Sequence, residues 1–152
     1  MKNPATTANP ETAACPFCNI VTRATNAHIV FEDAISLAFL DNRPLFPGHG
    51  LLITKQHYAT LYDIPSNLIG PLFSNAQMLA AVVQHAMQAD GSFVAMNNIV
   101  SQSVPHFHIH IVPRKRGDGL RGFFWPRHKL ADEEAAVVQK LIVTALQEAK
   151  SD

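Results

Sequence analysis

Short apolar segments with alternating polar positions recur along the chain and predict β-strands. Five segments have this pattern, and they cover residues 28–32, 35–40, 51–54, 93–96 and 105–113. The first two are separated only by Asp33-Ala34, which is typical of a hairpin. Two prolines and two glycines lie between residues 42 and 50, so this stretch is expected to be a loop. The pattern therefore predicts a sheet of about five strands.

A helical period appears in other parts of the chain. Residues 16–24 are expected to form a short helix, and residues 65–89 form the longest predicted helix, which Asp90-Gly91 ends. Residues 132–150 predict a C-terminal helix whose first turn carries three acidic residues, which complement the helix dipole. The fold class is thus α+β: an antiparallel sheet of about five strands, with one long helix and one C-terminal helix packed on it.

The length of 152 residues is typical of one domain that buries a substantial core. Residues 1–14 are polar and lack the apolar centre of a signal peptide, so we expect a flexible N-terminal tail on a cytoplasmic protein. Residues 15–152 are then a single domain, with a C-terminal extension from about residue 117. No segment approaches the length of a transmembrane helix, and no membrane association is expected.

The charge balance bears on the class of ligand. Lysine plus arginine and aspartate plus glutamate number 12 each, so the formal net charge is zero. A general nucleic-acid binder usually has a basic excess, and we therefore expect no nucleic-acid partner. A small phosphorylated ligand remains compatible with this composition. The 8 histidines are numerous for a chain of this length and direct attention to imidazole chemistry.

Three histidines alternate with apolar residues in the last predicted strand. Successive side chains of a strand point to opposite faces, so His106, His108 and His110 share one face, whereas Phe107 and Ile109 point to the other. A merely solvated face does not explain the choice of histidine, because serine or threonine would serve as well. Either the three imidazoles bind one catalytic Zn²⁺, or one imidazole is a nucleophile that its neighbours orient.

The only two cysteines form a C-x-x-C motif at Cys15 and Cys18. A secreted disulfide scaffold would need more cysteines, and a thioredoxin-like redox motif would need a surrounding βαβ pattern that this sequence lacks. Two thiolates are also half of a tetrahedral zinc site. The motif leaves two interpretations open, a metal site with two further ligands or a reduced pair packed under the first helix.

Three blocks of the sequence together resemble the histidine triad (HIT) superfamily. Residues 102–114 resemble its signature, in which three histidines alternate with apolar residues. Residues 15–20 resemble the opening of many bacterial members, and residues 38–41 with residues 47–57 resemble the middle block. The resemblance implies a HIT-like fold and a hydrolase or nucleotidyl transferase. Such an enzyme binds a nucleotide and cleaves at the α-phosphorus of a nucleoside phosphoramidate or a dinucleoside polyphosphate.

The resemblance also implies roles for individual residues. His108 would attack the phosphorus and form a nucleotidyl-histidine. His110 and His49 would lie beside it, holding the correct tautomer and stabilising charge, and His106 would be the third catalytic histidine of the signature. The implied nucleotide-binding residues are Asp41 at the ribose hydroxyls, and Asn97, Gln102 and Ser103 near the phosphate.

Several of these assignments leave alternatives open. A purely local role in a turn or loop is the alternative for Asp41, His49 and Ser103. The loop of residues 97–102 is shorter than in many relatives, which leaves either Asn97 or Asn98 as the residue near the phosphate. The enzymatic interpretation itself has two competitors, a three-histidine zinc metallohydrolase and a non-catalytic nucleotide-binding module.

The resemblance implies a metal site as well. Zinc-containing relatives complete the site of Cys15 and Cys18 with His57 and His106, so His106 stays open between catalysis and metal binding. Such a Zn²⁺ would be structural and not catalytic, because four protein ligands leave no open position for a substrate or water.

The segment after the signature offers further candidates for binding. Contacts to a polyphosphate are a possible role of Lys115, Arg116 and Arg121. We expect one of two roles for Phe123, Phe124 and Trp125. They either stack on a base or, in the interpretation we favour, pack against a partner subunit. By resemblance only, we expect a homodimer. No function is assigned to His28, His85 and His128.

Overall fold

The computed structural model describes residues 15–120 and 127–150 of the chain. The predicted N-terminal tail and the predicted roles of Arg121, Phe123, Phe124 and Trp125 lie outside the described residues. The chain divides into two compact units, Met1–Asp118 and Gly119–Asp152, and each is described by itself.

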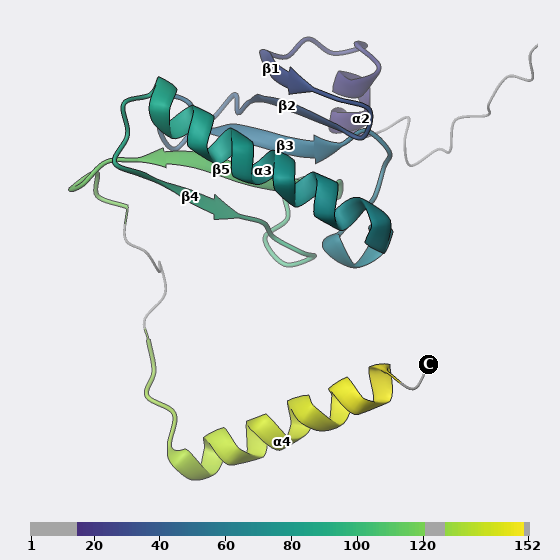
Figure 1. Ribbon diagram of the computed structural model, residues 1–152, viewed down its shortest axis with the longest axis vertical. Coiled ribbons are helices and arrows are strands. Elements are labelled where there is room, and N and C mark those ends of the chain that lie inside the picture. The colour runs from purple at the N-terminus through teal and green to yellow at the C-terminus, as the bar shows by residue number, and fades with distance from the viewer. Residues whose placement is uncertain (1–14, 121–126, 151–152) are drawn as a thin grey trace, which may run out of the picture. The chain divides into compact units, whose positions relative to one another are not determined.

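Five antiparallel strands form the sheet of the first unit in the order β1-β2-β3-β5-β4 (Figure 1). Their bounds are β1 Ile29–Glu32, β2 Ser36–Leu40, β3 Gly50–Thr54, β4 Gly91–Ala95 and β5 His108–Arg114. The helices are α2 Pro16–Val21, the 3-10 helix η1 Leu61–Asp63, α3 Ser66–Ala86 and, in the second unit, α4 Asp132–Ala149. The predicted α+β class with a sheet of five strands, one long helix and one C-terminal helix is confirmed.

Helix α2 ends at Val21 and not at residue 24, and β4 covers Gly91–Ala95 and not residues 93–96. Two further predicted boundaries are wrong for identifiable reasons. Strand β5 begins at His108 and not at residue 105, because the amide of His106 is turned back to the carbonyl of Val104 at 2.8 Å. Helix α3 ends at Ala86, three residues before the predicted end, because Gln88 takes a positive φ of 49° that breaks the helix. Gly91 consequently does not cap the helix and instead opens β4, where it pairs with Arg114.

The sheet has an apolar layer on each face, as strand alternation requires. Helix α3 crosses one face (Figure 1), where it contributes Leu72, Ala76 and Leu79 to a core with strand residues. The strand side chains of this core are Ala38, Leu52, Ile109 and Ile111, joined by Phe107. On the other face, Phe17 and Ile20 of α2 pack in a second core with Leu37, Phe39, Leu51 and Ile53. Strands β2 and β3 therefore contribute side chains to both cores.

Helix α4 begins with the predicted acidic turn. The carboxylate of Glu134 accepts a hydrogen bond from the amide of Ala131 at 3.2 Å, which caps the start of the helix. None of its described side chains is buried. Among the described residues, no helix combines the length and the apolar character that crossing a membrane would require.

The burial of β3 predicts where the fold is most sensitive. Leu52 is fully buried in the core under α3, so we expect Leu52→Ala to lower the free energy of unfolding by about 2–5 kcal/mol. Val30 is 53% exposed, and Val30→Ala is expected to cost less than about 1 kcal/mol. Urea denaturation followed by circular dichroism measures both, and equal losses would contradict the assignment of Leu52 to the core.

Candidate active site and metal cluster

A cavity of about 810 Å³ opens on the α2 side of the sheet. It brings together α2, the segment that leads into β1, the end of β2 and the histidine strand β5. Four of the residues singled out in the sequence line it, namely Asp41, Ser103, His108 and His110. Side chains on its apolar wall include Phe17, Ile20, Phe39 and Leu51. The cavity therefore combines polar groups with an apolar wall, as small-molecule sites commonly do.

His108 lies at the start of β5, opposite Ile53 of β3, and is only 3% exposed. Its Nδ1 lies 2.7 Å from the backbone carbonyl oxygen of His106. A carbonyl oxygen only accepts, so Nδ1 must carry the proton that it donates. In the neutral imidazole, Nε2 then keeps an unshared electron pair. The neutral form of His108 thus lines the cavity in the tautomer that a nucleophile needs.

His49 and His110 form a chain of hydrogen bonds beside His108. The amide of Leu45 donates to Nδ1 of His49 at 3.1 Å, so the neutral ring of His49 carries its proton on Nε2. That nitrogen donates to Nδ1 of His110 at 2.9 Å. The remaining proton of His110 is therefore on its Nε2, where it is available to an acceptor in the cavity. The rings of His110 and His108 are 5.0 Å apart between centroids.

Burial keeps these two imidazoles neutral. Burial, with smaller contributions from His108 and His49, lowers the pKa of His110 from 6.5 to about 4. Burial also lowers the pKa of His49, although the carboxylate of Asp41 opposes this effect. Both rings therefore lack a positive charge near pH 7. The chain of hydrogen bonds from His49 to His110 can then interact with a ligand only through its oriented N–H dipoles.

Asp41 forms the local turn considered for it and also lines the cavity, while its contact with ribose stays a prediction. One carboxylate oxygen accepts a hydrogen bond from the amide of Arg43 at 2.8 Å, which is a turn of the expected local kind. The other oxygen lies 3.8 Å from Nε2 of His49, and the side chain is 17% exposed and lines the cavity. The turn fixes the backbone of Asp41, and the second carboxylate oxygen can still accept a hydrogen bond from a ligand.

The amide side chains of the loop of residues 97–102 bond to backbone groups of this loop and of residues 59–61. Asn97 donates to the carbonyl of Ser101 at 3.1 Å, and Asn98 accepts from the amide of Leu61 at 2.8 Å. Gln102 accepts from the amide of Ile99 at 3.1 Å and donates to the carbonyl of Ala59 at 2.6 Å. None of these three amide side chains lines the cavity, whereas Ser103 does. Phosphate contacts by Asn97 or Gln102 stay predictions.

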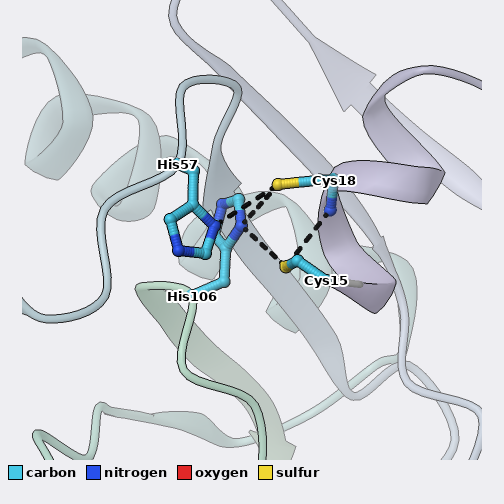
Figure 2. A group of neighbouring side chains, drawn as sticks. All are labelled: Cys15, Cys18, His57 and His106. Atoms are coloured by element: carbon cyan, nitrogen blue, oxygen red, sulfur yellow. Dashed lines mark hydrogen bonds between the residues drawn. The ribbon is translucent and has the colours of Figure 1, made fainter. Parts of the chain in front are cut away.

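A second cluster joins α2 to the entrance of β5 (Figure 2). The side chains of Cys15, Cys18, His57 and His106 place one ligand atom each within 4.8 Å of all the others. Nδ1 of His106 is 3.4 Å from Sγ of Cys15 and 3.6 Å from Sγ of Cys18. Nδ1 of His57 is 3.3 Å from Sγ of Cys18. A tetrahedral ion with Zn–S of about 2.3 Å and Zn–N of about 2.05 Å would separate S from N by about 3.6 Å.

The protonation states of His106 and Cys18 favour the binding of a metal cation by the cluster. Nε2 of His106 donates to the carbonyl oxygen of Thr54 at 2.7 Å, so its Nδ1 presents an electron pair to the thiols. Burial lowers the pKa of His106 from 6.5 to about 4, which keeps the ring neutral. Burial and the adjacent Cys15 raise the pKa of Cys18 to about 12. The second thiolate thus needs a compensating positive charge, which a divalent metal supplies.

The geometry weakens one interpretation of the three histidines. Both ring nitrogens of His106 are engaged away from the cavity, one with Thr54 and the other with the cysteines. Among the described residues, His106 and His110 belong to two different clusters with metal-ligand spacing, His106 with the cysteines and His110 with Asp41 and His49. His106 therefore does not share one ion with His108 and His110, although all three lie on the predicted face. The backbone carbonyl of His106 orients the ring of His108. A catalytic role of His106 itself stays a prediction.

Several cavity residues were not predicted from the sequence. Phe17 and Ile20 line the wall, and their spacing of three on α2 is the signal that pairs them on one helix face. His28, to which no function was assigned, also lines the cavity. Lys115 and Arg116, by contrast, follow the far end of β5 and do not line it. Their predicted contact with a phosphate chain is not supported by this geometry.

Comparisons with known proteins agree with these features. The family model described as HIT domain matches residues 22–117. An uncharacterized HIT-like protein of Saccharolobus solfataricus is 34% identical over 135 residues, covering 87% of this chain and 97% of that protein. The adenosine 5'-monophosphoramidase of Saccharomyces cerevisiae is 32% identical over 139 residues, covering 89% and 84%. A zinc-bound histidine triad family protein from Mycobacterium smegmatis superposes with a TM-score of 0.68 at 32% identity, covering 91% and 99%.

The lowered pKa of His110 predicts how stability depends on pH. Between pH 6.5 and about 4 the unfolded chain takes up a proton at this position and the folded chain does not, so acidification favours unfolding. The group contributes up to about 1.4 kcal/mol per pH unit to the slope of unfolding free energy against pH. His110→Asn should flatten that slope, measured by urea denaturation from pH 7 to pH 4.5. An unchanged slope would show that His110 protonates equally in both states.

Proposed function

The chain belongs to the histidine triad (HIT) family, and from this premise we propose that it is a nucleotide-binding hydrolase or nucleotidyl transferase. It would cleave at the α-phosphorus of a nucleoside phosphoramidate or a dinucleoside polyphosphate. The observation that carries the proposal is the hydrogen bond from Nδ1 of His108 to the carbonyl of His106, which leaves Nε2 as the free ring nitrogen of a histidine that lines the cavity. The name of the yeast relative, a monophosphoramidase, favours the phosphoramidate.

The first chemical step forms the nucleotidyl-histidine. The electron pair on Nε2 of His108 attacks the α-phosphorus, a new P–N bond forms, and the bond from phosphorus to the leaving nitrogen or oxygen breaks. The leaving group takes the electron pair and a proton from a donor in the cavity or from solvent. The imidazole becomes positively charged, and the carbonyl of His106 stabilises that charge because it accepts from Nδ1.

The second step regenerates the enzyme. Water, or another acceptor hydroxyl, attacks the phosphorus, the P–Nε2 bond breaks, and the acceptor proton is released. His108 recovers its neutral form with the proton still on Nδ1. Nε2 of His110, held by His49, donates to a non-bridging phosphate oxygen as charge builds in each transition state. Because the hydrogen bond from His49 already orients the N–H group of His110, no free energy is spent on reorienting it during the reaction.

The cavity offers a place for each part of a nucleotide. The carboxylate of Asp41 suits the ribose hydroxyls, since it is an acceptor and its backbone is fixed by the turn to Arg43. The hydroxyl of Ser103 suits a phosphate oxygen or the leaving atom. Phe17 and Ile20 provide apolar surface for a base. Purine nucleotides, with the larger base, are the expected substrates.

We propose that the four-residue cluster binds a structural Zn²⁺. Two thiols and two imidazole Nδ1 atoms give the donor set and the spacing of a closed tetrahedral site. The bound ion would fix α2 and the loop that carries His57 to the entrance of β5. Because four protein ligands fill the site, the ion has no position for a substrate, and the chemistry belongs to His108.

Some expectations stay predictions of the sequence and the resemblance. They are the homodimer, the cytoplasmic location, the lack of a nucleic-acid partner, and a single domain from residue 15 with an extension from about residue 117. The non-catalytic binding module also remains the competing function. It requires the same cavity and is separated from the enzyme only by a measurement of product release.

Removal of the nucleophile tests the proposed reaction. We expect His108→Ala to lower kcat/KM by about 10⁴-fold or more, because the variant lacks the nitrogen that is proposed to attack the phosphorus. Binding of adenosine 5'-monophosphate should persist, since the contacts proposed for Asp41 and the apolar wall remain. The substrates are adenosine and guanosine phosphoramidates beside diadenosine polyphosphates, with product release followed by chromatography.

The control for this variant is His85→Ala, which replaces an exposed histidine outside the cavity and should leave turnover unchanged. Normal turnover by His108→Ala would refute the nucleophile. Nucleotide binding by the wild type without release of product from any substrate of the panel would instead favour the non-catalytic module.

Metal analysis tests the structural zinc. The purified protein should contain about one zinc per chain, and Cys18→Ser should contain far less, because the variant loses one of four ligands. Chelation should lower the melting temperature of the wild type and leave that of Cys18→Ser nearly unchanged. Elemental analysis and thermal denaturation provide the two readouts. A wild type that is free of zinc, and whose melting temperature does not respond to added Zn²⁺, would refute the site.

A further inference from the structure

Helix α2 belongs to the metal cluster and to the cavity wall at once. Cys15 and Cys18, at its start and in its first turn, face the histidines of the cluster. Pro16, Phe17 and Ile20 of the same helix line the cavity. We propose that metal occupancy sets the affinity for the nucleotide by holding α2 in place as a wall of the cavity. This inference rests on the proposed function, because it concerns the same cavity.

Phe17 makes the physical connection between the two sites. It lies between the two cysteines in sequence and is only 8% exposed. Its ring meets His108 edge to face, with centroids 5.2 Å apart at 88°, and meets His106 at 5.8 Å. It also contacts Phe39 of β2 at 5.4 Å. A displacement of α2 would therefore remove an aromatic side chain from contact with the nucleophile and with a metal ligand together.

The two sides of the cluster are anchored unequally. His106 is fully buried, donates to Thr54, and is followed by Phe107, whose amide donates to the carbonyl of Tyr58 at 2.6 Å. This side stays with the sheet without the metal. Helix α2 has only 6 residues, and isolated helices of this length are not stable in water. Loss of the metal is thus expected to free α2 rather than β5.

This asymmetry predicts which step the metal affects. The hydrogen bond that sets the tautomer of His108 lies at the start of β5. The hydrogen bonds of His49 join the loop that precedes β3 to His110. Helix α2 takes part in none of these bonds. Metal loss should therefore raise the dissociation constant and KM for the nucleotide and leave kcat within about twofold. If α2 holds the wall in only about a tenth of the metal-free molecules, the apparent dissociation constant rises about tenfold. Cys15 and Cys18 are then positioning residues for nucleotide binding.

The experiment measures binding of adenosine 5'-monophosphate by isothermal titration calorimetry. Zinc-loaded protein, chelated protein and chelated protein after return of Zn²⁺ are compared, with metal content determined for each. We expect the dissociation constant to rise about tenfold on chelation and to recover fully. In zinc-loaded Phe17→Leu it should already be raised, and chelation should then add less than about threefold, because the wall contact is already weakened. His85→Ala should behave as the wild type.

Hydrogen–deuterium exchange shows whether the change is local. Exchange should accelerate in residues 16–21 on chelation and stay constant in β3 and β5. Exchange that accelerates throughout the sheet would overturn the inference, because the metal would then support the whole fold. An equal dissociation constant with and without zinc would overturn it and leave the proposed hydrolase intact. No binding to the zinc-loaded protein would instead count against the proposed function itself.

Discussion

The carbonyl oxygen of His106 accepts the Nδ1 proton of His108 at 2.7 Å, and the chemistry proposed for the cavity depends on this hydrogen bond. It selects the tautomer with an electron pair on Nε2 and supports the positive charge that a phosphorus adduct places on the ring. The carbonyl can serve His108 because the amide of His106 turns back to Val104 just before β5 begins. The delayed start of the strand is therefore part of the site.

The histidine strand connects three environments through simple alternation. Phe107, Ile109 and Ile111 enter the core under α3, so the strand cannot slide by one residue without moving imidazoles into apolar surroundings. On the opposite face, His106 meets the cysteines, and His110 meets His49 from the loop before β3. Helix α2 covers this face, with Cys15 and Cys18 beside His106 and with the ring of Phe17 against His108. The proposed metal site and the proposed catalytic site are thus separate in chemistry but share a helix and a strand.

The local patterns predicted the elements well and their ends less well. Alternation and helical period identified the five strands and three α-helices of the described residues but not the 3-10 helix η1, because burial of one face leaves a regular trace only in longer elements. They missed the end of α3 at Ala86, since the positive φ of Gln88 that follows it is a backbone feature without a composition signal. They also missed the backbone groups to which Asn97, Asn98 and Gln102 bond, at Ser101, Leu61 and Ala59, since the partners of an amide side chain depend on the folded path of the backbone.

The sequence by itself determined the face of the strand that carries the three histidines, the cysteine pair at the start of α2 and the family blocks around them. Alternation in a strand is a local property, so no distant contact was needed. Only the tertiary structure decided how the three histidines divide their work. His57 and Cys18 are 39 residues apart in sequence, and His49 and His110 are 61 apart, so their meeting depends on the order of strands in the sheet. Proton positions on the rings follow from those partners, because each backbone carbonyl or amide permits only one hydrogen-bonding role.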